Sequence, residues 1–159
     1  YDEAQYNLGV MYSHGEGVTQ NHAKAFELYQ KAAKQGQVDA QNNLGVMYEN
    51  ATGIAQDYTK AVMWYKKSAE QGLLEAQYNL GWMFENGFGV AQDDTQAFHW
   101  YHKAALQGDS MAEYTIGKMY LYGKGVEQDE SKARLWLNKA CDKAKNMSCD
   151  YCHFCLAVK

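Results

Sequence analysis

The chain has 159 residues, of which 47% are hydrophobic and 14% aromatic, so it can bury a continuous core and is not a disordered chain. Its formal net charge of −4 argues against nucleic-acid binding, which needs a basic stripe along one face. No apolar run approaches the roughly 18 residues of a membrane span.

Most landmarks of the sequence recur every 36 residues, and all 14 glycines fall on four phases of that period. Three of the repeating sets are Ala4, Ala40, Ala76 and Ala112, then Leu8, Leu44, Leu80 and Ile116, then Gly9, Gly45, Gly81 and Gly117. A fixed period of this size predicts a solenoid, in which each unit buries its apolar face only against its neighbours. We therefore expect four repeats, at residues 1–36, 37–72, 73–108 and 109–143, followed by a C-terminal capping helix with cysteines at residues 144–159.

The first part of each repeat predicts an amphipathic helix. Its apolar residues are three or four positions apart, so on a helix they form one stripe. In the first repeat this stripe consists of Ala4, Leu8, Met11 and Tyr12. Gly9 borders the stripe, and glycine inside a helix costs about 1 kcal/mol relative to alanine. Since this glycine recurs in every repeat, we expect it to mark a close contact between helices.

The second part of each repeat predicts another helix, which follows a glycine-containing loop. One polar residue in each repeat stands where an N-cap belongs, with a side chain that can accept from unpaired backbone N–H groups. These residues are Asn21, Asp57, Asp93 and Asp129. Small and large residues alternate along the second helix, as interdigitated helix packing requires. The expected core positions are Ala25, Leu28, Tyr29, Ala32 and Ala33, with Trp64, Trp100 and Trp136 replacing Leu28 in later repeats.

The resulting pattern, AxxxLGxxYxxGxGVxxDxxxAxxWYxxAAxxG, resembles the Sel-one-like repeats, a branch of the tetratricopeptide-like α-solenoids. The resemblance implies an all-α fold, a right-handed α-solenoid of helix-turn-helix repeats that forms an α/α superhelix. It also implies a non-catalytic adaptor or scaffold, bacterial in origin, that binds a protein or peptide in a concave groove, with a monomer as the favoured state. The departures from the pattern are Ala51, Arg134, Leu137 and Ala144.

All four cysteines lie in the last 19 residues. Cys141 and Cys149 are separated by seven residues, a spacing that resembles the cysteine-rich Sel-one-like proteins of Helicobacter, where such a pair bridges neighbouring units. A disulfide that closes so short a loop would stabilise the fold by roughly 2–3 kcal/mol. It would also require an oxidising compartment, so the resemblance favours a periplasmic or secreted protein.

Two interpretations of Cys152 and Cys155 remain open. Both fall on apolar phases of the repeat, so they can be small core residues of the capping helix. Alternatively, Cys149, Cys152, His153 and Cys155 could form a metal site, although structural zinc usually takes its ligands from two separated segments. We predict no metal site and no cofactor.

No arrangement of residues predicts an active site, and we assign no catalytic residue. His99 and His102 are three positions apart without a third ligand nearby, which favours solvated surface histidines over a metal site. Relatives in the cysteine-rich branch have been linked to β-lactam binding and hydrolysis, so a cell-envelope enzyme or a small-molecule binder of that kind is the alternative function. The nearest match to its serine–lysine motif is Ser131-Lys132-Ala133-Arg134, which ends in an arginine that cannot act as a base.

The side of each first helix that faces away from the apolar stripe is the predicted partner-binding face. Aromatic and acidic residues dominate there, and rigid aromatic side chains are typical anchors of interfaces. The candidate residues are Tyr6, Asn42, Val46, Tyr78, Trp82, Tyr114 and Lys118. Neighbouring first helices could also half-bury these rings, and the two interpretations are compatible. Since carboxylates outnumber lysines on this face, it favours a partner segment with basic and apolar character.

Overall fold

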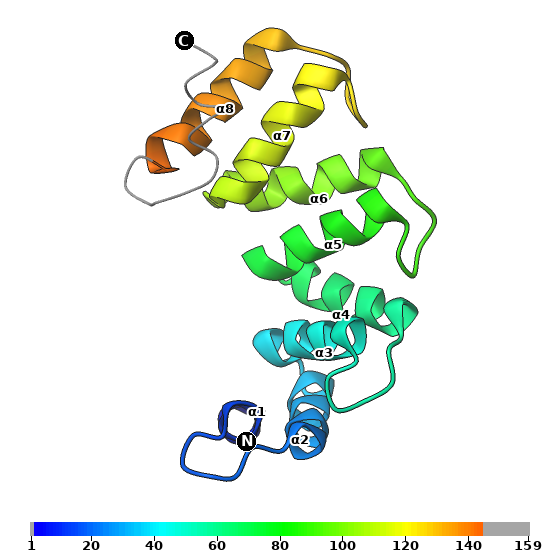
Figure 1. Cartoon of the computed structure of the whole chain (residues 1–159), viewed down its shortest axis with the longest axis vertical. Helices are drawn as coiled ribbons and strands as arrows, with labels where there is room; N and C mark the ends of the chain where they lie inside the picture. Colours follow the sequence, from blue (N-terminus) through cyan, green and yellow to red (C-terminus); the bar gives the residue numbers. More distant parts are fainter. Residues whose placement is uncertain (1, 145–159) are drawn as a thin grey trace. The chain divides into compact units, whose positions relative to one another are not determined.

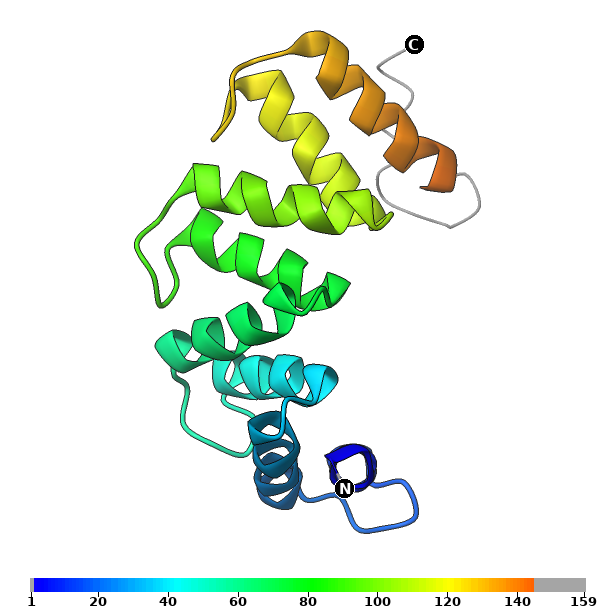
Figure 2. The same ribbon diagram turned by 180° about the vertical axis from the view of Figure 1, so that it is seen from behind.

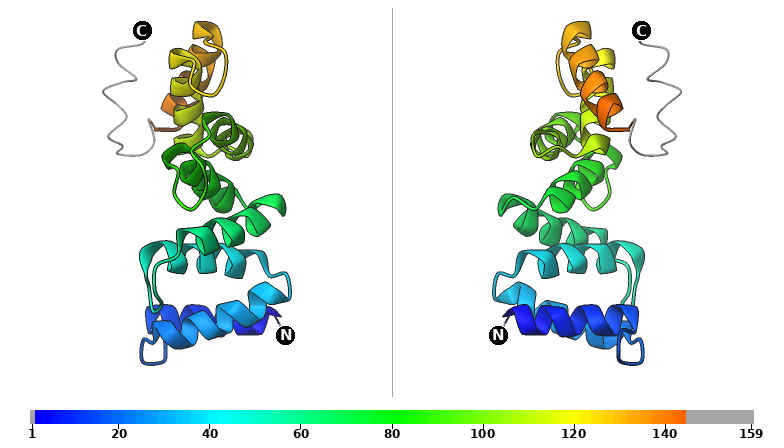
Figure 3. Two further views of the ribbon diagram at one scale, coloured as in Figure 1. Left: turned by 90° about the vertical axis from the view of Figure 1, so that its right-hand side faces the viewer. Right: turned by 90° about the vertical axis from the view of Figure 1, so that its left-hand side faces the viewer.

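The computed structural model describes residues 2–144, and in that range eight α-helices are joined by loops, without any strand (Figure 1). They are α1 (Asp2–His14), α2 (His22–Lys34), α3 (Val38–Asn50), α4 (Tyr58–Glu70), α5 (Leu74–Asn86), α6 (Asp94–Leu106), α7 (Ser110–Tyr122) and α8 (Glu130–Ala144). Consecutive helices pack together, as α1 does with α2, α3 with α4 and α7 with α8 (Figure 2, Figure 3). The prediction of an all-α repeat solenoid is confirmed. Among these described helices, none combines the length and the apolar character that crossing a membrane requires.

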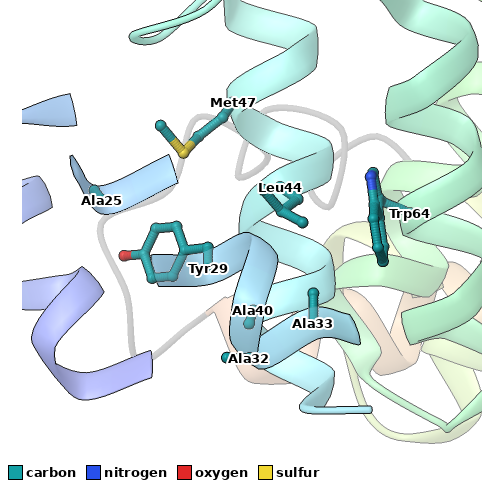
Figure 4. Close-up of a cluster of buried hydrophobic side chains, with 8 residues drawn as sticks. All are labelled: Ala25, Tyr29, Ala32, Ala33, Ala40, Leu44, Met47 and Trp64. Carbon is teal, nitrogen blue, oxygen red and sulfur yellow. The ribbon is translucent and has the colours of Figure 1, made fainter. Parts of the chain in front are cut away.

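The described residues form two compact units, one made of residues 2–80 with 88–91 and the other of residues 81–87 with 92–144. In the first unit a core cluster lies where α2, α3 and α4 meet, and Figure 4 shows Tyr29, Leu44, Met47 and Trp64 in it. Four alanines fill the space between these large side chains, namely Ala25, Ala32, Ala33 and Ala40. In the second unit the buried side chains of α7 and α8 include Ile116, Met119, Ala133, Trp136 and Leu137. This pairing of small with large residues is the interdigitation that the sequence predicts.

Each second helix begins at its predicted N-cap. The side chains of Asn21, Asp57, Asp93 and Asp129 accept hydrogen bonds at 2.9–3.0 Å from backbone N–H groups in the first turn of the helix that follows. These N–H groups have no partner within the helix, so each cap stabilises its helix by about 1 kcal/mol. The four cap predictions are confirmed.

The glycine in the middle of each first helix is buried against a large side chain of the second helix. A Cβ atom at Gly81 would lie 2.8 Å from Cδ1 of Tyr101, and one at Gly117 would lie 2.7 Å from Cγ of Leu137. Both distances are shorter than ordinary van der Waals contact, so only glycine lets the two helices approach this closely. The predicted close contact is confirmed.

The apolar stripe of α1 is more exposed than the sequence predicts. Leu8 and Met11 are 39% and 37% exposed, whereas Leu44 and Leu80 are fully buried at the same phase as Leu8. The stripe of a first helix is covered by the second helix of the preceding repeat, as α2 covers that of α3. Within residues 2–144 no helix precedes α1. The assignment of this stripe to the core is therefore correct for the later repeats and wrong for the first.

Ala51, which departs from the repeat pattern, lies at the C-terminus of α3 in the left-handed backbone region, with φ of 56°. Glycines occupy the same phase in the other repeats, at Gly15, Gly87 and Gly123, all with positive φ. A residue with a Cβ atom is strained there by roughly 1–2 kcal/mol. Ala51 therefore adopts the same turn as the glycines, and the strain lowers the stability of the folded state.

The tryptophans of the second helices are core residues, as predicted. Trp64, Trp100 and Trp136 are each 7% exposed. A lysine three positions later lies over each ring, with its ammonium 4.4–4.6 Å from the ring centroid, in the pairs Lys67 with Trp64, Lys103 with Trp100 and Lys139 with Trp136. Such cation–π contacts stabilise by about 0.5–1 kcal/mol at exposed sites. These three lysines therefore pack on core residues of α4, α6 and α8.

Candidate partner-binding surface

The seven side chains predicted to contact a partner lie on the first helices of the four repeats. Tyr6 is on α1, Asn42 and Val46 on α3, Tyr78 and Trp82 on α5, and Tyr114 and Lys118 on α7. Lys118 is exposed, and the other six are half-buried. These rings are thus partly packed in the fold and partly accessible, which agrees with the two interpretations holding together.

Several of these side chains have intramolecular contacts that fix their orientation. The Tyr6 ring lies 5.8 Å from the Tyr29 ring, centroid to centroid. Asn42 accepts a hydrogen bond at 3.3 Å from the side-chain amide of Asn79. The Lys118 ammonium lies 5.5 Å from the centroid of the Tyr114 ring, so the fold brings this predicted pair together. Side chains held in one rotamer lose less conformational entropy when a partner binds.

A glutamate–tyrosine hydrogen bond links the two helices of the second and third repeats, and sequence reasoning missed it. The Tyr65 hydroxyl donates to Glu49 at 2.5 Å, and the Tyr101 hydroxyl donates to Glu85 at 2.8 Å. Burial, followed by the neighbouring Glu49 carboxylate, raises the pKa of Tyr65 far above its ordinary range. The signal was present in the sequence, because both pairs have the same separation of 16 residues and lie one period apart.

Glu85 is also the centre of an ion-pair network in the second unit. Its carboxylate accepts from the Lys124 ammonium at 2.8 Å, and the same ammonium lies 3.5 Å from Asp94. Burial alone would raise the pKa of Glu85, but the hydrogen bonds from Lys124 and Tyr101 and the charges of Lys124 and Lys118 outweigh it, and the pKa is lowered. Glu85 is thus ionised and hydrogen-bonded by Tyr101 and Lys124, and the Lys124 ammonium largely compensates its negative charge.

A cleft lies between the helices of the first repeat and α3 of the second repeat. About 210 Å³ of space is lined by Ser13, His14, Tyr29, Asn43, Val46, Met47 and Thr52. Val46 is one of the seven predicted partner-binding residues, and the other six lining residues are not among them. Ser13 and Asn43 both hydrogen-bond the hydroxyl of Tyr29, whose pKa is raised mainly by burial. The cleft combines polar walls with the apolar side chains of Val46 and Met47.

The two neighbouring histidines on α6 have different environments. His99 is exposed, as predicted, but His102 is half-buried, stacked on Phe98 at 5.6 Å and edge-on to Trp136 at 5.5 Å. Burial first, and the charge of His99 second, lower the pKa of His102. The prediction of a solvated histidine is therefore wrong for His102, because the neighbouring rings enclose it. Among the described residues, no group of three or more histidine, cysteine, aspartate or glutamate side chains could hold a metal ion.

The near match to a serine–lysine motif at the start of α8 has the exposed Arg134 where the lysine would stand, and its Lys132 has structural contacts. The Lys132 ammonium lies 3.3 Å from Asp129 and 5.4 Å from the centroid of the Tyr120 ring. Ser131 is an exposed residue of the first helical turn. Lys132 thus supports the N-terminus of α8 and the contact with α7, which is a structural role.

The cysteine predictions fall mostly beyond the part of the chain that the structure describes. Cys141 lies near the end of α8 and is half-buried. Cys149, Cys152, His153 and Cys155 lie outside residues 2–144, as does the capping helix apart from Ala144. The Cys141–Cys149 disulfide therefore stays a prediction.

Comparison with known proteins places four consecutive matches to the Sel1 repeat on the chain, at residues 2–37, 38–73, 74–109 and 110–145. Among solved structures, the chain is similar to a protective antigen of uropathogenic Escherichia coli with an SLR fold, at 40% identity and a TM-score of 0.88. That match covers 91% of this chain and 31% of the E. coli protein. No match was found among curated proteins.

Two further structures extend this comparison. A Sel1 repeat protein from Oxalobacter formigenes is 38% identical with a TM-score of 0.86, over 90% of this chain and 59% of that protein. Cysteine-rich protein B of Helicobacter pylori is 26% identical with a TM-score of 0.64, over 88% of this chain and 98% of that protein. The chain thus spans about a third of the E. coli protein and somewhat over half of the O. formigenes protein.

Proposed function

The chain belongs to the Sel1 repeat family, and from this premise we propose that it is a non-catalytic adaptor that binds a protein or peptide through its first helices. The fold commonly serves as a protein-interaction module. The observation that carries the proposal is the half-burial of aromatic side chains on the first helices, above all Tyr78 and Trp82 on α5. Partly packed aromatic side chains are rigid, and rigid aromatic area at low entropy cost is what an interface anchor supplies.

The repeat itself does not require these aromatic residues. Asn42 and Val46 occupy the phases of Tyr78 and Trp82 one repeat earlier, and Lys118 occupies the phase of Trp82 one repeat later. The same helical position thus accommodates an aliphatic, an aromatic and a charged side chain. The Tyr78 phase is tyrosine in three of the four repeats, with Asn42 as the exception. The identity of the side chain at the Trp82 phase is therefore available for recognition, whereas the buried positions of Leu44, Leu80 and Ile116 stay apolar.

The proposed partner segment carries basic and apolar residues. Glu3 and Glu75 are exposed carboxylates on the first helices, and Asp39 is half-buried there. Glu85 contributes little to this field, because Lys124 neutralises it. Charges on the rim of an interface act mainly on association rate and on the choice of partner, so the aromatic anchors would provide most of the affinity.

We also propose that the protein acts in an oxidising compartment, the periplasm or the exterior of a bacterial cell. The support is the predicted Cys141–Cys149 disulfide together with the similarity to a Helicobacter cysteine-rich protein. A partner would then be an envelope protein or a protein outside the cell.

The experiment that tests the function is affinity capture with matched baits. The full chain, a Tyr78→Ala/Trp82→Ala variant and a Lys66→Ala variant are immobilised and exposed to envelope or host extract. Lys66 is an exposed residue of α4 whose contact with Glu70, at 3.9 Å, is a weak surface ion pair. We expect one saturable partner on the full chain and on Lys66→Ala and its loss from the double variant. Equal capture by all three baits would reject the proposed surface, and turnover of a chromogenic β-lactam would reject the non-catalytic assignment.

A further inference from the structure

The glutamate–tyrosine hydrogen bond of the second and third repeats has no counterpart in the first. The phase of Glu49 and Glu85 is occupied there by Ser13, while the phase of Tyr65 and Tyr101 keeps its tyrosine as Tyr29. Tyr29 is 2% exposed, so its hydroxyl stands at the same inner position as those of the other two tyrosines. The first repeat therefore retains the donor and lacks the carboxylate.

The cleft of the first repeat lies at this position. Its volume is about 210 Å³, and its lining includes both Ser13 and Tyr29, the counterparts of the glutamate and the tyrosine in the later repeats. Thr52 lines it as well, and Thr52 stands two repeats before Lys124, the residue that reaches Glu85 in the third repeat. The cleft thus contains counterparts of the residues around Glu85, with Ser13 in the place of the glutamate itself.

The chemistry of the lining selects an anion with an aliphatic stem. Ser13, Tyr29, Thr52 and the amide of Asn43 can all donate hydrogen bonds, and none of the seven lining residues is acidic. Ser13 and Asn43 already hydrogen-bond the Tyr29 hydroxyl, so a bound carboxylate would replace that hydroxyl as their acceptor. A carboxylate accepts several hydrogen bonds at once, and bonds to a charged acceptor are the stronger kind. Val46 and Met47 add apolar surface against which methylene groups can pack.

We propose that this cleft binds the side-chain carboxylate of a glutamate from a partner segment, in the place that Glu49 and Glu85 fill internally in the next two repeats. We assign the carboxylate to a glutamate side chain, because the residues that accept from the corresponding tyrosines in the next two repeats are Glu49 and Glu85. The inference deepens the proposed function, since it assumes that the chain binds a partner segment. It gives that segment an acidic residue at the first repeat in addition to the basic and apolar residues expected elsewhere.

The test is an NMR titration of the isotope-labelled full chain with N-acetylglutamate N-methylamide. The matched probes are N-acetylglutamine N-methylamide, which lacks the charge, and N-acetylglycine, which carries only a terminal carboxylate. We expect saturable shifts at the backbone amides of Ser13, Asn43 and Thr52 with the glutamate probe and at least a tenfold weaker response with the glutamine probe. Equal shifts with both probes, or a response to N-acetylglycine that exceeds the response to the glutamate probe, would overturn the assignment.

Two variants make the result specific to the cleft. Ser13→Glu restores the pattern of the later repeats, so the chain should fold and its own carboxylate should exclude the glutamate probe. Tyr29→Phe removes one donor hydroxyl and should lower the affinity for the glutamate probe severalfold. The backbone amide spectrum should remain that of a folded chain. Undiminished binding to both variants would place the probe elsewhere. The titration needs no partner protein, so its failure is distinguishable from a failure of Tyr78 and Trp82 to capture one.

Discussion

Replacing Gly81 by alanine tests the close approach of α5 and α6 through the sign of the stability change. In an ordinary helix interior this change stabilises by about 1 kcal/mol, because alanine has the higher helix propensity. Here the new Cβ atom would lie 2.8, 2.9 and 3.0 Å from Cδ1, Cε1 and Cγ of Tyr101. Tyr101 is 1% exposed and its hydroxyl donates to Glu85 at 2.8 Å, so the ring cannot swing away without breaking that bond.

Overpacking a well-filled core costs roughly 1–3 kcal/mol, which exceeds the propensity gain over most of its range. We therefore expect Gly81→Ala to destabilise by up to about 2 kcal/mol, and the bulkier Gly81→Leu to destabilise by more. Urea unfolding followed by circular dichroism measures both.

A double-mutant cycle with Tyr101→Ala isolates the contact. Without the ring, Gly81→Ala should become stabilising by about 1 kcal/mol, so the coupling between the two sites should be on the order of 1–3 kcal/mol. A Gly81→Ala protein that is more stable than the parent, or additivity of the two changes within about 0.5 kcal/mol, would refute the close-approach argument.

Two further predictions concern stability, and a third concerns the disulfide. Ala51→Gly should stabilise by about 0.5–1 kcal/mol in thermal unfolding, because relief of left-handed strain exceeds the added chain entropy; an unchanged or lower midpoint would contradict it. The folded-state pKa of Glu85 is lowered from its ordinary value of 4.5, so its contribution is present above pH 4.5 and lost as the pH falls. Lys124→Met should therefore be less stable than the parent at pH 7, and the difference should shrink below pH 4.5; a difference that is constant with pH would contradict this. Non-reducing peptide mapping should recover Cys141 linked to Cys149, and recovery of both as thiols from oxidised, folded protein would remove the bridge.

The sequence was sufficient to predict the fold because the repeat presents the same evidence four times. A single leucine or asparagine has many structural explanations, but a cap residue that returns every 36 positions has few. The caps at Asn21, Asp57, Asp93 and Asp129, and the glycine contact at Gly81, followed from that recurrence.

The errors arose where one copy differs from the others. The stripe containing Leu8 was assigned to the core because its counterparts Leu44 and Leu80 are buried, but burial also depends on a preceding helix that α1 lacks within the described residues. His102 was expected in solvent because its spacing to His99 was considered without the Phe98 and Trp136 rings around it. Contacts between repeats are set by residues about 36 positions apart, and single-helix periodicity does not report them.

The candidate surface was predicted only as a face. Helix geometry identified the side of α5 that carries Tyr78 and Trp82, since direction around a helix follows from spacing. It did not identify the glutamate–tyrosine bonds, because spacing within one helix gives directions for that helix alone and each bond joins a first helix to a second helix. The shared separation of 16 residues in both pairs is the sequence signal that was missed. The absence of the glutamate at Ser13 acquires meaning only once those bonds are known.

The central claim is that Tyr78 and Trp82 bind the partner and are dispensable for the fold, and one binding measurement tests it most directly. The variant Tyr78→Asn/Trp82→Val carries at α5 the residues that α3 has at the same phases, so the repeat pattern accommodates it. Calorimetry with the captured partner should show at least a 30-fold loss of affinity, about 2 kcal/mol, with helical content equal to that of the parent. Unchanged affinity in the folded variant would show that Tyr78 and Trp82 do not bind the partner.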